Sequence, residues 1–246
     1  MDRMIYTAMT GATAAQHRQQ LLAHNLANVS TTGFRAELAT FRAVPVRGDG
    51  ATTRVFALEA TAGHLDAPGP VNPTGRPLDL AAKGGSWFTV QGLDGTEAYT
   101  RAGAFEVSPD GTLVSPQGLP VLTDGGAPIT VPANAQVDVA ADGTVSARVG
   151  GAAAQNLGRI KLVTPGADTP IARSEDGLFR PKDGQPLEAD AQARVQSGAL
   201  EGSNVNPIEA MVGMIAAARQ FEVQMKMLQN GETNDRSAAQ LLSLNG

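Results

Sequence analysis

The two ends of this 246-residue chain share an apolar spacing that its middle lacks. From Met1 onward, apolar residues recur at alternating intervals of three and four, interrupted only by Gln19. The series is Met1, Ile5, Ala8, Ala12, Ala15, Leu22, Leu26 and Val29. This spacing is typical of a helix that buries one stripe, and the segment contains no Pro. It predicts one helix of about 40 Å that ends in the turn-forming cluster 28–33.

The C-terminal region repeats the pattern behind a clear helix start. Asn206 can cap the helix, Pro207 suits the first helical position, and Glu209 falls at the third. The apolar series that follows is Met211, Met214, Ala218, Phe221, Met225 and Leu228. Asn230 and Gly231, with the polar run to Arg236, interrupt this apolar series.

Between the two ends, short alternating or β-branched runs predict strands. They lie at 88–90, 104–107, 129–131, 137–139 and 159–163, and Asp-Gly pairs that favour tight turns separate many of them. The predicted fold class is α+β, with terminal α-helices forming a coiled-coil stem and an antiparallel β-rich domain inserted between them. The expected divisions are an N-terminal stem helix at 1–34, a linker or extended segment at 35–84, the β-rich domain at 85–200 and a C-terminal stem helix at 201–246. A helical continuation as far as Phe41 is one option for the start of the linker.

Composition excludes most kinds of catalytic or cofactor site. The chain has no Cys, which removes thiolate chemistry and disulfides, and its 19 basic against 24 acidic residues give a net charge of −5, which argues against a nucleic-acid binder. His17, His24 and His64 lack metal-ligand spacing, and the β-rich segment has no Ser–His–acid grouping. No apolar run is long enough to cross a membrane, and no cleavable signal peptide is evident. We therefore expect no catalytic residue, no cofactor and no metal site.

The architecture itself is the most informative feature. Neither terminal helix can bury its stripe alone, so the helices can pair with one another, with neighbouring subunits, or with both. A helical stem that carries a lateral β-rich domain suits a polymer. Two other classes stay open: a secreted β-domain enzyme acting on polysaccharide, with the helices as a dimer stem, and a coiled-coil scaffold that is already folded in the free monomer.

Several short motifs resemble those of the flagellar rod and hook protein family. They are Asn25-Leu-Ala-Asn28, Thr31-Thr-Gly-Phe-Arg35, Arg76-Pro-Leu-Asp79, Tyr99-Thr-Arg101, Leu200-Glu-Gly-Ser-Asn-Val205 and Met211-Val-Gly-Met-Ile215. They occur in the family's order over nearly the whole chain. The opening of the chain, residues 41–45 and residues 221–226 are most similar to the proximal-rod members, while distal-rod and hook subunits are the alternatives within the family.

The resemblance implies a structural subunit of the flagellar basal-body rod that polymerises to transmit torque. Its implied partners are copies of itself, other rod proteins and the flagellar export apparatus, with no nucleic acid and no membrane insertion. The implied location is the rod that crosses the periplasm, reached without a cleavable signal peptide. The stripes and the turn after the first helix then become the expected assembly interface. Its residues are Ile5, Ala8, Ala12, Leu22, Asn25, Leu26, Asn28 and Phe34 in the N-terminal region, and Met211, Met214, Ala218, Phe221, Met225 and Leu228 in the C-terminal helix.

Overall fold

The computed structural model describes residues 2–45, 55–166 and 168–243. It contains one helix near each end of the chain and a β-rich middle, as the sequence predicts at that level. The described chain divides into two compact units. Unit 1 comprises 1–27, 37–63 and 206–246, and unit 2 comprises 28–36 and 64–205. Each unit is described by itself below.

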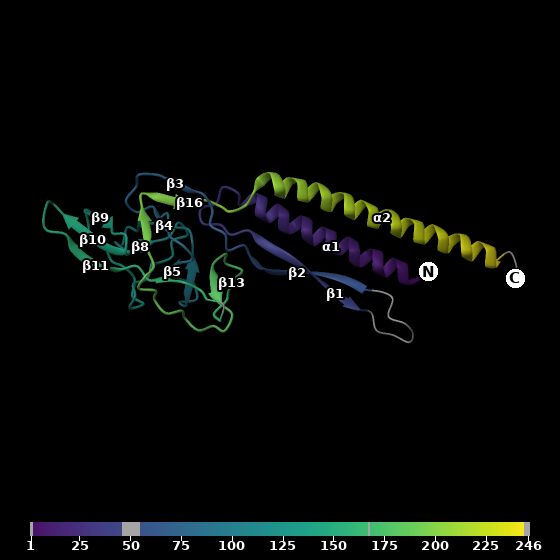
Figure 1. Cartoon of the computed structure of the whole chain (residues 1–246), viewed down its shortest axis with the longest axis horizontal. Helices are drawn as coiled ribbons and strands as arrows, with labels where there is room; N and C mark the ends of the chain where they lie inside the picture. Colours follow the sequence, from purple (N-terminus) through teal and green to yellow (C-terminus); the bar gives the residue numbers. More distant parts are fainter. Residues whose placement is uncertain (1, 46–54, 167, 244–246) are drawn as a thin grey trace. The chain divides into compact units, whose positions relative to one another are not determined.

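Unit 1 is built on a pair of antiparallel helices, α1 (Asp2–Ala27) and α2 (Pro207–Ser243). They lie side by side, with the start of α1 and the end of α2 at the same end of the pair (Figure 1). Two close approaches fix the register: a Cβ atom on Gly213 would lie 3.0 Å from Cδ1 of Leu22, and one on Gly11 would lie 2.9 Å from Cδ of Gln224. A side chain at either position would require the Leu22 or Gln224 side chain to shift, so the two glycines favour a close approach of the helices.

In the described part of α2, Gly213 and Ala218 are half-buried, and the other buried or half-buried positions follow an unbroken alternation of four and three. They are the buried or half-buried residues Ala210, Met214, Ala217, Phe221, Gln224, Leu228, Gly231 and Asp235. On α1, the buried or half-buried positions Ile5, Ala8, Ala12, Ala15, Gln19, Leu22 and Leu26 follow the predicted alternation. Many of these side chains are small or polar, so the interface between the helices buries less apolar area than an interface rich in leucine would.

The predicted end of the first helix and the predicted start of the second are both confirmed. The first helix ends at Ala27, directly before the predicted cluster, and Asn206 Oδ1 accepts hydrogen bonds from the amides of Ile208 (3.1 Å) and Glu209 (3.4 Å) at the start of α2. The second helix continues to Ser243, through residues 230–236 where the apolar series is interrupted. A single helical glycine costs only about 1 kcal/mol, which neighbouring contacts can offset.

Residues that follow α1 form strands instead of more helix. Strands β1 (Glu37–Pro45) and β2 (Val55–His64) pair in a two-stranded sheet, and β1 packs against α1. The helical option as far as Phe41 is therefore wrong. The side-chain amide of Asn25 fixes the start of β1, because its Nδ2 donates to the Glu37 carbonyl (3.0 Å) and its Oδ1 accepts from the Glu37 amide (2.9 Å).

Unit 2 contains the remaining strands of the described chain. In chain order they are β3 (Val71–Pro73), β4 (Leu80–Ala82), β5 (Trp87–Gln91), β6 (Glu97–Thr100), β7 (Glu106–Val107), β8 (Leu113–Val114), β9 (Ala135–Val139), β10 (Thr144–Val149), β11 (Gln155–Arg159), β12 (Leu162–Val163), β13 (Ile171–Arg173), β14 (Phe179–Pro181), β15 (Val195–Ser197) and β16 (Ala199–Glu201). The largest sheet has the order β12-β5-β6-β14-β13, and a second has the order β11-β10-β9. All of the registered pairs are antiparallel.

The five-stranded sheet separates two apolar clusters. Phe88 and Val90 of β5 face the main core, and Trp87 belongs to a smaller cluster with Tyr99 and Phe179. This division follows from the alternation of side chains along a strand. The smaller cluster lies beside the charged residues described in the next section.

Several details of the β-rich region differ from the sequence-based expectation. The predicted strand 159–163 is divided, because β11 belongs to the three-stranded sheet and β12 to the five-stranded one. Residues 129–131 form only an isolated bridge, between Thr130 and Thr112. The boundary expected at residue 85 falls after β3 and β4, which pair with β16 and β15. Five of the six Asp-Gly pairs do place glycine at positive φ, and the pair at Asp124 uses the following Gly126 instead.

Candidate functional site

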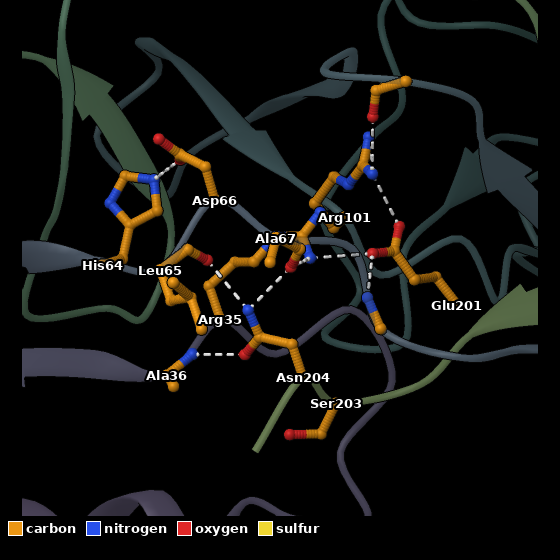
Figure 2. Close-up of polar contacts among 12 residues, drawn as sticks. Arg35, Ala36, His64, Leu65, Asp66, Ala67, Arg101, Glu201, Ser203 and Asn204 are labelled. Atoms are coloured by element: carbon orange, nitrogen blue, oxygen red, sulfur yellow. Dashed lines mark hydrogen bonds and ion pairs between the residues drawn. The ribbon is translucent and has the colours of Figure 1, made fainter. Parts of the chain in front are cut away.

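A buried ion cluster joins three distant parts of the chain in unit 2 (Figure 2). Glu201, at the end of β16, contacts Arg35 Nη1 through Oε1 (2.9 Å) and Arg101 Nη2 through Oε2 (2.8 Å). Its Oε1 also accepts a hydrogen bond from the amide of Gly69 (3.0 Å). Only 1% of the Glu201 side chain is exposed. The carboxylate is thus shared by two guanidinium groups in a position that water does not reach.

Backbone carbonyls accept further hydrogen bonds from the two arginines, while Nε of each stays buried without a hydrogen-bond partner among the described residues. Arg35 donates to the Ala67 carbonyl (2.5 Å). Arg101 donates to the carbonyls of Ser86 and Gly84, the latter at 3.0 Å. The buried guanidinium groups therefore hold loop segments in place as well as the carboxylate.

Asn204 adds a second connection between the same segments. Its Oδ1 accepts from the Ala36 amide (2.7 Å), and its Nδ2 donates to the carbonyls of Leu65 and Ala67 (both 2.8 Å). Two backbone hydrogen bonds run alongside, from the Gly33 amide to the Glu201 carbonyl (2.8 Å) and from the Asn204 amide to the Phe34 carbonyl (3.2 Å). Unit 2 thereby clamps together the segment that follows α1 and the segment that precedes α2.

Burial dominates the electrostatics of this cluster. It lowers the pKa of Arg101 to about 10, although the Glu201 carboxylate acts in the opposite direction. Burial also lowers the pKa of Arg35, again opposed by Glu201. Both arginines remain charged at neutral pH. Their guanidinium carbons each lie 5.8 Å from the centroid of the Trp87 ring, close enough for cation–π attraction.

His64 borders the cluster on its aromatic side. Its Nε2 lies 2.9 Å from Asp66 Oδ1, and its ring contacts the rings of Phe179 (4.7 Å between centroids) and Trp87 (5.8 Å). Burial lowers its pKa, and the nearby charge of Arg35 lowers it further, against the influence of Asp66. The imidazole is therefore neutral at physiological pH, which fits a packing role.

The turn between Asn28 and Phe34 is shaped by glycine. Gly33 adopts φ +68°, and a Cβ atom there would overlap the backbone of Arg101. The turn is closed by the Thr31 amide, which donates to the Asn28 carbonyl (3.1 Å), and the buried Phe34 ring lies under the guanidinium of Arg173 (4.3 Å). Only glycine meets both the conformational and the steric requirement at this position.

The expected interface residues occupy three kinds of position. Those on α1 (Ile5, Ala8, Ala12, Leu22 and Leu26) and three on α2 (Met214, Phe221 and Leu228) are buried or half-buried and follow the inward-facing spacing of the helix pair. Asn25 is buried in contact with Glu37, while Asn28 and Phe34 lie in the glycine turn of unit 2. Met211, Ala218 and Met225 lie one residue beyond Ala210, Ala217 and Gln224, and the two methionines are exposed. The expected residues are thus divided between the two units.

One face of α2 carries large apolar side chains without cover in the described chain. Its members are Ile208 (72% exposed), Met211 (52%), Val212 (61%) and Ile215 (56%). The spacing of three, one and three places them on one side of the helix, and Ala210, Met214 and Ala217 lie on the side towards α1. We call these four residues the outer apolar face of α2.

The described residues offer no evident site for other chemistry. They contain no group of His, Asp and Glu side chains arranged to hold a metal ion. In the same residues, no helix combines the length and the apolar character needed to cross a bilayer.

Three family models match separate parts of the chain. Residues 5–35 match the flagella basal body rod protein model, residues 81–147 the D1 domain of flagellar hook protein FlgE/F/G, and residues 196–241 the C-terminal domain of flagellar basal body rod FlgEFG protein. The flagellar basal-body rod protein FlgF of Salmonella typhimurium is 46% identical over 252 residues, which cover 99% of this chain and 100% of the relative. The FlgF protein of Escherichia coli is 45% identical with the same coverage.

The chain belongs to the FlgF family of flagellar basal-body rod proteins. This confirms the resemblance found in the sequence. FlgG of Bacillus subtilis, also named a flagellar basal-body rod protein, is more distant, at 30% identity over 99% of each chain. The family is one of structural flagellar rod proteins and not of enzymes.

The buried cluster takes one residue from each of the three matched regions. Arg35 lies in the first, Arg101 in the second and Glu201 in the third. All three residues lie within the motifs of the family resemblance, but no pattern in the sequence predicted a role for any of them. The signal that could have found them is the presence of single charged residues in short motifs of apolar and small residues, which suggests buried pairing.

Proposed function

We propose that this chain is a structural subunit of the bacterial flagellar basal-body rod, within its proximal part, and that it polymerises through its terminal helices to transmit torque. Family membership supports the rod assignment. The structural observation that carries the proposed mode of assembly is the outer apolar face of α2. Four large apolar side chains on one helix face are costly to leave in water, and burial against a neighbouring subunit would remove that cost.

The proposed architecture is a coiled-coil stem that carries an inserted antiparallel β-rich domain. The alternating spacing of buried positions on α1 and α2 supports the stem. The division into segments 1–34, 35–84, 85–200 and 201–246 is part of the proposal, with one change: strands β3 and β4 are grouped with the β-rich domain because they pair with β16 and β15. Repeated contacts of one face of a subunit with a different face of the next would build a helical polymer.

The proposed partners are copies of the chain and other rod proteins. Export through the flagellar export apparatus, without a cleavable signal peptide, would bring the subunit to the rod that crosses the periplasm. The role requires no catalysis, cofactor, metal, nucleic acid or membrane insertion. The net charge of −5 and the lack of Cys are consistent with this role.

The test compares two substitutions that add the same charge to α2. Ile215→Asp places a carboxylate on the outer apolar face, and Gln220→Asp places one at an exposed polar position. In a strain that lacks the native gene, Ile215→Asp should be made and folded but fail to support rod assembly and swimming, while Gln220→Asp should support both. Normal motility with Ile215→Asp would show that this face is not an assembly surface.

A further inference from the structure

Asn230 and Gly231 form an asparagine–glycine pair inside α2. This dipeptide is the one most prone to spontaneous deamidation in flexible chains, because glycine does not hinder attack by its own backbone nitrogen. The Asn230 side chain is exposed, whereas Gly231 is buried within the inward-facing series of α2. The same two residues interrupt the apolar series of the sequence, and the structure places them within the helix.

One side-chain contact spans the pair and two more lie in the helix after it. Thr233 Oγ1 donates to the Gln229 carbonyl (2.9 Å), and Ser237 Oγ donates to the Thr233 carbonyl (3.0 Å). Arg236 and Glu232 form an ion pair one helical turn apart (2.5 Å). The ion pair adds a small stabilisation to the helix, in which the Gly231 amide donates to the carbonyl four residues earlier.

We propose that Asn230 is a deamidation site that α2 keeps silent while it is folded and that reacts when this helix opens. In the open chain, the Gly231 nitrogen attacks Cγ of Asn230, a C–N bond forms, the bond to the side-chain nitrogen breaks and ammonia leaves. Water then opens the resulting succinimide at either carbonyl and gives aspartate or isoaspartate. No oxidant or reductant is needed. In the helix, the backbone dihedral angles keep the Gly231 nitrogen away from Cγ.

The two products have different consequences for the helix pair. Aspartate at this exposed position adds a charge but leaves the backbone unchanged. Isoaspartate adds one carbon to the backbone next to the buried Gly231, which shifts every later residue of α2 out of its inward-facing spacing. A subunit whose α2 stays open therefore accumulates isoaspartate at residue 230, and its α2 can no longer form the regular helix. Any effect of this isoaspartate on rod assembly rests on the function proposed above.

The experiment measures deamidation and helix opening in the same sample. The full-length chain is incubated at neutral pH, and peptide mapping by mass spectrometry gives the rate at Asn230 relative to a blocked synthetic peptide of residues 227–236. Hydrogen exchange of the same residues gives the fraction of time that α2 is open. The deamidation rate divided by the peptide rate should equal that open fraction within about threefold. Phe221→Asp, which opens the helix pair, should raise both quantities together.

Two variants distinguish deamidation of Asn230 from opening of α2. Asn230→Gln should abolish the signal, and Gly231→Ala should reduce it strongly while it retains the helix. Deamidation at the peptide rate in a chain with protected amides, or its absence in a chain whose amides exchange freely, would overturn the proposal. Neither result depends on motility, so failure of the rod assignment would leave this test intact.

Discussion

Neutralising Glu201 should strongly destabilise unit 2. Glu201→Gln keeps nearly the same shape but removes the charge that two buried guanidinium groups share. One of the contacts at 2.8 and 2.9 Å would then face an amide NH2 group instead of an oxygen. Breaking a buried ion pair by removing one partner costs about 3–5 kcal/mol, and this carboxylate serves two arginines and one backbone amide. We therefore expect a loss of about 4 kcal/mol in the free energy of unfolding.

The assay is urea unfolding of the full-length chain followed by tryptophan fluorescence. Trp87 is the only tryptophan, and it is buried beside both arginines, so its emission reports on this cluster. With a denaturant slope of about 2 kcal/mol/M, the midpoint should fall by about 2 M urea.

The matched variant is Glu106→Gln. The Glu106 side chain is 67% exposed and lies 3.9 Å from Arg76, so its neutralisation should cost at most about 1 kcal/mol. If Glu201→Gln proves no more destabilising than Glu106→Gln, then the buried cluster does not hold unit 2 together, and the argument from burial and shared charge is wrong.

Three further predictions address single positions. Gly33→Ala should destabilise unit 2 by well over 1 kcal/mol in the same urea assay, whereas Gly95→Ala, at φ +78° but with open space around it, should cost only about 1 kcal/mol. Because the pKa of His64 is lowered in the folded chain, the unfolded state binds a proton more readily, so stability should fall from about pH 8 to about pH 5; His64→Gln should flatten that decline, and an unchanged decline would exclude His64 as its source. Ala12→Leu should force the closely spaced helices apart and speed hydrogen exchange in both, while Thr13→Leu, at an exposed position, should leave exchange unchanged.

The limits of the helices could be read from sequence because local chemistry sets them. Asn206 and Pro207 act within one turn of the helix start, and Gly33 supplies a positive φ that few residues other than glycine adopt. The inward-facing side of α2 was harder to assign. The apolar series predicted from the sequence includes Met211 and Met225, which are exposed, whereas the inward-facing positions include Ala217 and the polar Gln224.

The charged cluster depends on tertiary structure that no local pattern encodes. Arg35 and Glu201 are separated by most of the chain and meet only after β16 pairs with β3 and the segment after α1 folds beside it. The single strand predicted at 159–163 is wrong for a related reason. Its composition fits one strand, but the chain passes from the three-stranded sheet to the five-stranded sheet at Ile160, which forms only an isolated bridge. The family resemblance identified the motifs that contain these residues, but only the structure shows that Arg35, Arg101 and Glu201 contact one another.

The chemical accessibility of the outer apolar face of α2, compared before and after assembly, tests directly whether the rod buries this face. The chain contains no cysteine, so Ile215→Cys introduces a single reactive thiol at a position that is exposed in the described chain. Maleimide labelling should be fast in the purified subunit and strongly suppressed in isolated basal bodies from a motile strain that carries this variant. Equal labelling in the subunit and in the basal bodies would show that the face stays open to solvent in the rod, which would contradict assembly through it.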